Sequence, residues 1–237
     1  MSDLYSHTLY EKPLEQAIAA QDLRLLSKIV KIVDTFPQHK TIDFFGGALC
    51  LAAEHGFLKG VRKLMTVSDP TYNNSAALRW AAMHGHEACV KTLIPVSDPK
   101  AENSHALTLA VGHGQVGCVK ALIKVSDPKE CGSVALKIAA EGGHLECVKL
   151  LIPVSDAMDN RSEALCRALK NGFWDVAEVL YPHSDLDGAL ESLTEWDGSD
   201  EKTQWLENKI VERAQILHDK IAQKVQHRGV TARKSKM

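Results

Sequence analysis

The sequence lacks the features that mark membrane, secreted and nucleic-acid-binding proteins. No stretch approaches the ~20 apolar residues that cross a bilayer, and the start, MSDLYSHTLYEKPLEQ, has no basic patch followed by an apolar run, so we expect no secretory signal. The formal net charge is only −2, so no global attraction draws the chain to nucleic acid or anionic lipid. Aromatic residues make up 5% of the chain, and this scarcity favours helices packed on helices over a β-sandwich.

The sequence also has few residues that point to chemistry. There is no G-x-S-x-G, no phosphate-binding glycine loop and no H-E-x-x-H. We therefore expect no enzymatic activity, no cofactor and no metal site. Six cysteines in 237 residues do not make a disulfide framework, and such a number is typical of a reducing compartment. We expect a cytoplasmic protein, or one that acts in a host-cell cytosol if it is a secreted effector.

What the sequence does contain is an internal repeat. The dipeptide Ser-Asp begins at five positions, each 29 residues after the last: Ser68, Ser97, Ser126, Ser155 and Ser184. Glycines follow the same step at Gly56, Gly85, Gly114, Gly143 and Gly172, as do Ala-Leu pairs beginning at Ala48, Ala77, Ala106, Ala135 and Ala164. A period of this length indicates a solenoid of stacked units.

Each repeat is predicted to hold two short helices. In one unit, Leu136 and Ala139 share a face of a first helix that Gly143 ends, and an apolar second helix follows. One serine per repeat precedes the first helix and is a predicted N-cap, with its hydroxyl accepting a hydrogen bond from a free N–H of that helix. These serines are Ser75, Ser104, Ser133 and Ser162.

The repeat resembles the ankyrin repeat. The segments AALRWAAMHGHEACVKTLI (76–94) and VALKIAAEGGHLECVKLLI (134–152) carry an alanine pair, a Gly-His step or its equivalent and a V-K-x-L-[IL] run. The period is 29 rather than the usual ~33, and sequences such as Ala76-Ala77-Leu78-Arg79 replace the T-P-L-H tetrapeptide. The missing residues fall where ankyrin repeats project a β-hairpin finger. The resemblance therefore implies an all-α, ankyrin-like α-solenoid of helix-turn-helix repeats with reduced or absent β-hairpin fingers.

The ends of the chain depart from the repeat and are expected to cap it, because a repeat cannot bury its apolar faces alone. We expect an N-terminal capping unit over residues 1–38, five repeats over 39–183 and capping helices over 184–226. The last of these helices runs from about Asp200 to about Gln226, and its alternative role is to bind a second copy or a partner. Residues 227–237, with several basic side chains, are expected to form a flexible basic tail.

Two columns of metal-ligand residue types run through the repeats. One holds Cys89, Cys118 and Cys147, and the other holds His55, His84 and His113. Stacked helical units lie on the order of 10 Å apart, which is too far for a disulfide or a shared zinc ion. We predict that the cysteines fill the core and that the histidines satisfy free carbonyls at helix ends. The resemblance implies a structural role for His86 and His144 as well.

Two surface features are candidates for binding. A basic ladder on the second helices, Arg62, Lys91, Lys120 and Lys149, suggests a nucleic-acid stripe or, alternatively, a solvated face paired with acids such as Glu87 and Glu146. The positions that vary most between first helices are free to specialise, and the resemblance implies that they form a concave, partner-binding face. The predicted partner-binding residues there and in the bordering loops are Phe44, Phe45, Tyr72, Arg79, Met83, Lys100, Glu102, Thr108, Lys129, Lys137 and Glu141.

We therefore predict a non-catalytic protein–protein interaction module that holds a partner protein on the concave face of a rigid repeat stack. One alternative is a stoichiometric inhibitor or effector that masks an enzyme or a nucleic-acid-binding complex. A second alternative is a nucleic-acid binder that uses the basic ladder. We expect no membrane partner and a monomer.

Overall fold

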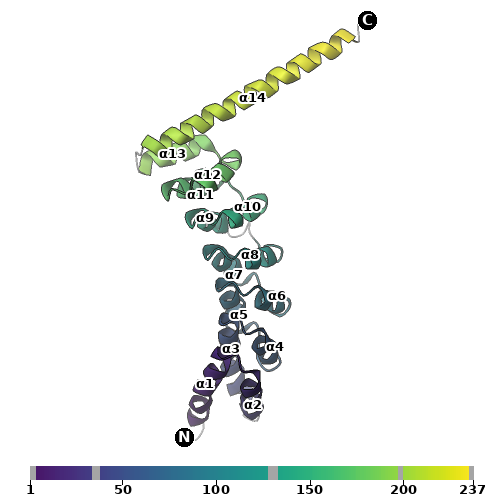
Figure 1. Cartoon of the computed structure of the whole chain (residues 1–237), viewed down its shortest axis with the longest axis vertical. Helices are drawn as coiled ribbons and strands as arrows, with labels where there is room; N and C mark the ends of the chain where they lie inside the picture. The colour runs from purple at the N-terminus through teal and green to yellow at the C-terminus, as the bar shows by residue number, and fades with distance from the viewer. Residues whose placement is uncertain (1–3, 34–37, 128–132, 197–199, 235–237) are drawn as a thin grey trace. The chain divides into compact units, whose positions relative to one another are not determined.

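The computed structural model describes residues 4–33, 38–127, 133–196 and 200–234 (Figure 1). The regular elements in these segments are all helices, with no β-strand among them, in agreement with the all-α prediction. No described helix is both long and apolar enough to cross a membrane. The chain divides into two compact units, Met1–Asp156 and Ala157–Met237. This division falls inside the segment 39–183 that we expected to hold the repeats.

In the first unit the helices alternate between two rows (Figure 1). The first helices of the pairs form one row: α1 (Leu4–Ala19), α3 (Gln38–Glu54), α5 (Tyr72–Met83), α7 (Ala101–Gly112) and α9 (Val134–Glu141). The second helices form the other: α2 (Leu23–Val33), α4 (Leu58–Leu64), α6 (Glu87–Leu93), α8 (Val116–Leu122) and α10 (Leu145–Leu151), with short 3-10 helices η1 (Ile94–Val96) and η2 (Ile152–Val154).

The core of the first unit is built from the columns that recur every 29 residues. The leucines Leu49, Leu78, Leu107 and Leu136 are buried along the first-helix row. The cysteine column is buried as predicted, with Cys89, Cys118 and Cys147 in the second-helix row. The recurring glycine ends each first helix; Gly85, for example, has a φ of 77°, a conformation that costs a residue with a Cβ.

The start of each first helix differs from the prediction. In α5 the residues Asn73, Asn74 and Ser75 have φ values of 49°, 56° and 59°, and in α7 the residues Glu102 to Ser104 repeat this left-handed turn. An N-cap needs an extended backbone that aims its hydroxyl at its own helix. The left-handed conformation does not provide it, and the N-cap role predicted for Ser75, Ser104, Ser133 and Ser162 is wrong.

These serines instead join neighbouring repeats. The Ser75 Oγ accepts a hydrogen bond of 2.8 Å from the backbone N–H of Asp98, the second residue of the next Ser-Asp dipeptide. Ser104 accepts from Asp127 at 3.0 Å, and Ser133 accepts from Asp156 at 2.9 Å. Each serine is almost fully buried. The serine column is therefore explained by contacts 23 residues further along the chain.

The Gly-His column forms a second set of bonds between repeats. The His86 Nε2 lies 2.7 Å from the backbone oxygen of Glu54, at the end of α3. The equivalent His144 Nε2 lies 3.0 Å from the oxygen of Gly112. Since a carbonyl only accepts, each ring nitrogen is the donor. The structural role expected for these two histidines is thus a contact between adjacent first-helix ends.

The N-terminal pair of helices, α1 and α2, is joined by a tight turn at Gln21-Asp22. The Asp22 carboxylate accepts hydrogen bonds from the backbone N–H groups of Arg24 and Leu25 at the start of α2. Helix α1 begins at Leu4, and Pro13 lies inside it without ending it.

The second unit contains α11 (Asp159–Lys170), α12 (Trp174–Leu180), η3 (Tyr181–His183), α13 (Leu186–Trp196) and α14 (Asp200–Lys234). Helix α14 packs on this unit through its first turns: the Trp205 ring lies 6.0 Å from Trp174 and 6.1 Å from Tyr181. The Lys202 Nζ donates to the oxygen of Lys170 at 3.2 Å, the same 32-residue contact that His86 makes. The start of α14 thus occupies the place of a second helix.

Helix α14 ends later than predicted. It continues to Lys234, so residues 227–234, expected to be part of a flexible tail, are helical, and that prediction was wrong. The segment has no proline to end the helix, and Arg228, Ala232, Arg233 and Lys234 are residue types that favour it. Residues 197–199, which precede this helix in the sequence, lie outside the described segments.

Candidate functional site

An apolar column lies partly open on the first-helix row of the first unit. Its members follow the 29-residue step: Leu51, Trp80, Leu109 and Ile138. The neighbouring leucine column is fully buried, whereas these side chains are half-buried or exposed, and Trp80 is the most open at 39%. A tryptophan this exposed on a periodic scaffold marks a surface that is available for contact. We call this surface the first-helix face.

A hollow of about 280 Å³ opens on this face between α5 and α7. Its lining comes from both helices and consists of Asn73, Ala76, Arg79, Trp80, Met83, His105 and Leu109. The Trp80 ring stacks on His84, one turn further along α5, with ring centroids 5.8 Å apart. His84 in turn is held by its Nδ1 contact of 3.0 Å to the Trp80 oxygen. The Trp80 ring thus forms an aromatic wall of the hollow, and its stacking on His84 helps to hold it in place.

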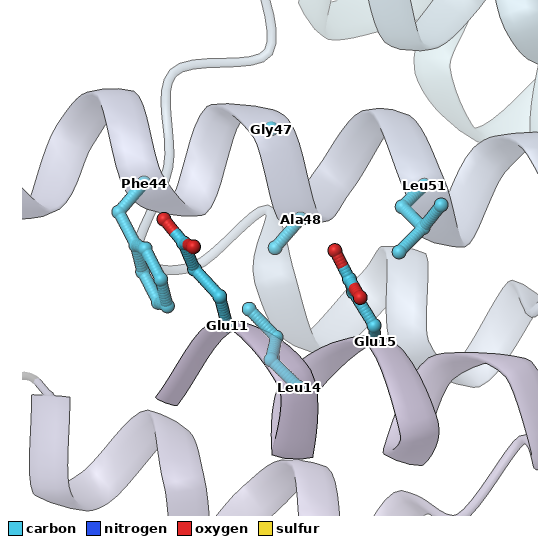
Figure 2. Close-up of a pocket in the computed structure, with 7 residues that line it drawn as sticks. All are labelled: Glu11, Leu14, Glu15, Phe44, Gly47, Ala48 and Leu51. Atoms are coloured by element: carbon cyan, nitrogen blue, oxygen red, sulfur yellow. The ribbon is translucent and has the colours of Figure 1, made fainter. Parts of the chain in front are cut away.

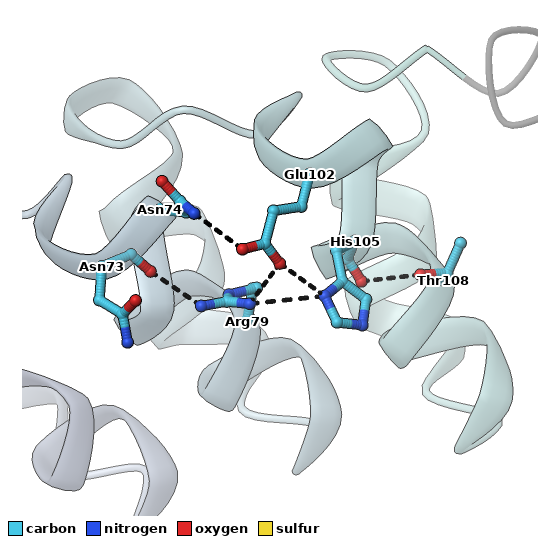
Figure 3. Close-up of polar contacts among 6 residues, drawn as sticks. All are labelled: Asn73, Asn74, Arg79, Glu102, His105 and Thr108. Carbon is cyan, nitrogen blue, oxygen red and sulfur yellow. Dashed lines mark hydrogen bonds and ion pairs between the residues drawn. The ribbon is translucent and has the colours of Figure 1, made fainter.

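A polar network closes one end of the hollow (Figure 3). The Arg79 guanidinium donates to the Glu102 carboxylate at 2.6 Å and to the backbone oxygen of Asn73 at 2.8 Å. Glu102 also accepts from the Asn74 side-chain amide at 2.7 Å and lies 3.1 Å from the His105 Nδ1. The hydrogen bonds from Asn74 and His105 are the main reason that the pKa of Glu102 is lowered.

This network places several predicted residues and changes the role of one. Arg79 and Met83 line the hollow, and Glu102 is bonded to Arg79. The Arg79 side chain, however, is only 18% exposed and joins α5 to the start of α7. Arg79 therefore helps to fix the shape of the hollow, and its guanidinium is already engaged within the chain rather than open to a partner. A substitution such as Arg79→Glu would disturb the repeat stack as well as any binding.

Other predicted residues are dispersed. Lys100 and Glu141 are exposed and Lys137 is half-buried, while the Thr108 hydroxyl donates to the His105 oxygen of its own helix. The half-buried Tyr72 ring packs against α3, so closely that a Cβ added at Gly46 would collide with it. None of these five residues lines the hollow. Lys129 lies outside the described segments.

The prediction for the two phenylalanines was partly wrong. Phe44 and Phe45 belong to helix α3, not to a loop, and their rings meet edge to face at 5.5 Å. Phe45 is 1% exposed and cannot contact a partner. Helix α3 begins at Gln38, before the first Ala-Leu pair of the repeat at Ala48, and both phenylalanines lie in this early part of the helix.

Sequence reasoning missed Trp80. The predicted binding columns are those whose residue types vary between repeats, whereas the column from Leu51 to Ile138 is uniformly apolar and therefore resembles core. Leu51, Leu109 and Ile138 remain half-exposed in a chain whose adjacent leucine column is buried. A tryptophan interrupting an aliphatic column was the available signal.

The basic ladder is present as a solvated surface. Arg62, Lys91, Lys120 and Lys149 are all exposed. Lys91 pairs with Glu87, and Lys149 pairs with Glu146 at 2.7 Å. These pairs agree with the alternative of a solvated face paired with acids. These carboxylates have lowered pKa values because of the lysine hydrogen bonds. Two of the four cations therefore already have acidic partners.

The histidine and cysteine columns show no arrangement for chemistry. His84 and His113 contact backbone oxygens one turn earlier at 3.0 Å, as predicted. Burial raises the pKa of Cys118 and of Cys166 to about 11, which disfavours the reactive thiolate. Among the described residues, no three His, Cys, Asp or Glu side chains are grouped so that they could hold a metal ion. Cys131 lies outside the described segments.

Comparison with known proteins points to one family. A family model of ankyrin repeats (3 copies) matches residues 49–130 and again residues 107–189, together more than half of the chain. Among curated proteins, no sequence is significantly similar to this one.

Two solved structures share the fold. The ankyrin repeat domain of Bcl-3, a unique member of the IkappaB protein family, superimposes with a TM-score of 0.56 and 22% identity over 72% of this chain and 85% of that one. The human ASB11 ankyrin repeat domain gives 0.54 and 21% over 68% and 82%.

Proposed function

Because this chain belongs to the ankyrin-repeat family, whose domains are in general protein–protein interaction modules, we propose that it binds a partner protein on its first-helix face. The observation that carries the proposal is the hollow between α5 and α7 with its exposed tryptophan. The resemblance to the family implied a concave binding face, and we propose this hollow as its anchor point. No catalytic step is part of the proposal.

The chemistry of the hollow favours an apolar anchor from the partner. Trp80, Met83 and Leu109 offer apolar surface, and tryptophan and methionine are enriched where proteins meet. The charges of Arg79 and Glu102 at the edge are already paired within the chain, so an incoming apolar side chain leaves neither charge unpaired. In the described part of the chain, the buried Arg79 Nε is the one nitrogen of this guanidinium without a hydrogen-bond partner. Burial of a central tryptophan typically contributes much of an interface's binding energy.

Rigidity supports the same function. Adjacent repeats are joined by the serine hydrogen bonds and by the histidine hydrogen bonds. The face is thus ordered before a partner arrives, and little conformational entropy is lost on association. We propose that presentation of a preformed surface is how the protein works, whether the bound partner is recruited or inhibited.

The test is capture of a partner from native cell extract by the wild type and by Trp80→Ala. We expect Trp80→Ala to weaken binding at least about tenfold. Val96→Ala is a matched control, because Val96 is 41% exposed but lies in η1 outside the first-helix row. Thermal melting checks that all three proteins are equally folded.

A partner held by the wild type and Val96→Ala but lost by folded Trp80→Ala supports the proposal. A partner that both variants retain contradicts the choice of face. Inhibition of the captured partner at a one-to-one ratio would identify the protein as a stoichiometric inhibitor.

A further inference from the structure

A second hollow lies at the N-terminal end of the first-helix face, between α1 and α3. It has a volume of about 350 Å³ and is lined by Glu11, Leu14, Glu15, Phe44, Gly47, Ala48 and Leu51. Figure 2 shows Glu11, Leu14 and Glu15 on one helix, facing Phe44, Ala48 and Leu51 on the other. Leu51 is also the first member of the apolar column that contains Trp80. The two hollows therefore belong to one face of the first unit.

This hollow combines an apolar floor with an acidic rim. Leu14 and Ala48 are each 4% exposed and form the floor with Phe44 and Leu51. Glu11 and Glu15 are exposed and stand one turn apart on α1. Among the residues whose side chains the structure describes, no lysine, arginine or histidine forms an ion pair with Glu11 or Glu15. Like charges at this spacing oppose the helix by about 0.2–0.5 kcal/mol, and a cation bound between them would remove that repulsion.

The occupant that matches both parts is a lysine or arginine side chain. Its aliphatic stem can pack on Leu14 and Leu51, while its charged head reaches the carboxylates at the rim. An arginine can bridge two carboxylate oxygens with parallel N–H groups. A purely apolar side chain would instead take water from Glu11 and Glu15 without replacing their hydrogen bonds, and a phosphate or carboxylate would be repelled.

The spacing of the two hollows relates this side chain to the apolar anchor. From the α1–α3 hollow to the α5–α7 hollow is two steps along the row, or about 20 Å at the usual helix packing distance. An α-helix covers this in about fourteen residues, and an extended segment covers it in about six. Both fit within one short segment of a partner.

We propose that the α1–α3 hollow binds a lysine or arginine of the same partner segment whose apolar side chain occupies the hollow at Trp80. This proposal rests on the proposed function, since it assumes that the first-helix face is the binding surface. It adds the chemistry of the partner, a segment with a basic residue and an apolar residue about 20 Å apart. It also fixes the direction in which that segment lies.

The test uses a phage-displayed library of random 16-residue peptides selected on the full chain. We expect the selected peptides to be enriched in Lys or Arg at a fixed separation from an apolar residue. Synthetic versions should bind Glu11→Gln/Glu15→Gln about tenfold more weakly than the wild type. The variant Glu11→Lys/Glu15→Lys should select acidic residues in place of basic ones.

The control Glu87→Gln/Glu146→Gln removes the same charge from the second-helix row, where these glutamates pair with lysines. Peptides should bind it as they bind the wild type. Equal weakening by the control would show a general effect of net charge and would overturn the proposal.

The remaining outcomes separate this proposal from the proposed function. Peptides that lose affinity for Trp80→Ala but not for Glu11→Gln/Glu15→Gln overturn the cation site and leave the proposed face standing. Peptides that need the glutamates but not Trp80 contradict the proposed function and the shared segment. No binder to the wild type, or binders indifferent to both changes, overturns both. Self-association in sedimentation that Glu11→Gln/Glu15→Gln abolishes would make a second copy the occupant and would also overturn the proposal.

Discussion

Replacement of Ser75 by alanine tests the hydrogen bonds that join the repeats. The Ser75 hydroxyl accepts from the Asp98 backbone N–H at 2.8 Å, and the serine is 1% exposed. Alanine removes the acceptor and leaves that N–H without its partner. An orphaned buried donor costs about 1–3 kcal/mol. Because Asp98 itself is exposed, water can approach the freed group, and we expect the lower part of this range, about 1–2 kcal/mol.

A glycine variant separates the hydrogen bond from the backbone conformation. Ser75→Gly loses the same hydrogen bond but relieves the left-handed residue, whose φ is 59°, of a Cβ penalty of about 1–2 kcal/mol. Glycine also loses about 0.5–1 kcal/mol through its greater freedom when unfolded. We therefore expect Ser75→Gly to be less destabilised than Ser75→Ala, the reverse of the order found in an ordinary helix.

The assay is urea unfolding at 25 °C, followed by circular dichroism, with hydrogen exchange of the Asp98 amide as a local readout. Ser75→Ala should lower the free energy of unfolding by about 1–2 kcal/mol, seen as a lower urea midpoint, and should speed exchange at Asp98. Unchanged stability in both variants would refute the hydrogen bond. Greater destabilisation by glycine than by alanine would refute the left-handed turn.

Two further predictions concern the other repeat columns. His86→Ala should lose about 1 kcal/mol of unfolding free energy with its bond to the Glu54 oxygen, whereas His86→Gln should retain most of it, because Gln115 donates to the Met83 oxygen from the same column; equal losses in urea unfolding would argue against the bond. The buried thiols of Cys118 and Cys166, with pKa values of about 11, should resist alkylation at pH 8 until the protein unfolds. Unfolded thiols ionise near pH 9.0, whereas these folded thiols stay neutral there. The contribution of the neutral thiols to the free energy of unfolding should therefore be complete below pH 9 and lost as the pH rises to 11. Cys118→Ala/Cys166→Ala should flatten this decline in stability.

The repeat itself could be predicted because its core columns recur without gaps. Leucine, alanine and cysteine columns at a 29-residue step specify two helices per unit and a buried interior, and the structure has both. The serine column could also be recognised in the sequence, but the backbone N–H group from which each serine accepts a hydrogen bond could not. A hydrogen bond from Ser75 to a residue 23 positions later depends on a left-handed turn that local propensity did not indicate.

The candidate site was only partly predictable for a similar reason. Arg79 and Met83 were predicted because their columns vary between repeats, and Glu102 was predicted as a loop residue beside them. The sequence could not show that the Arg79 guanidinium donates its hydrogen bonds within the chain, because the main acceptor, Glu102, is positioned by the next repeat. Trp80 was overlooked because an apolar column suggests burial, and exposure depends on how two helices diverge at the surface.

The contacts between repeats have a consequence for how such a chain can change in length. Each serine accepts from a residue 23 positions later, and each histidine contacts a residue 32 positions earlier. Both kinds of bond recur at the 29-residue step of the repeat. If residues 98–126 were deleted, Asp127 would follow Ser97 and would take the place of Asp98 opposite Ser75. The serine and histidine bonds would be remade across the new junction, whereas the bonds of Arg79 and Asn74 to Glu102 would be lost with that residue. A deletion of any other length would leave buried groups facing the wrong neighbours. The chain can therefore lose or duplicate whole repeats at many cut points, not only at helix boundaries, provided that the number of residues is a multiple of the period.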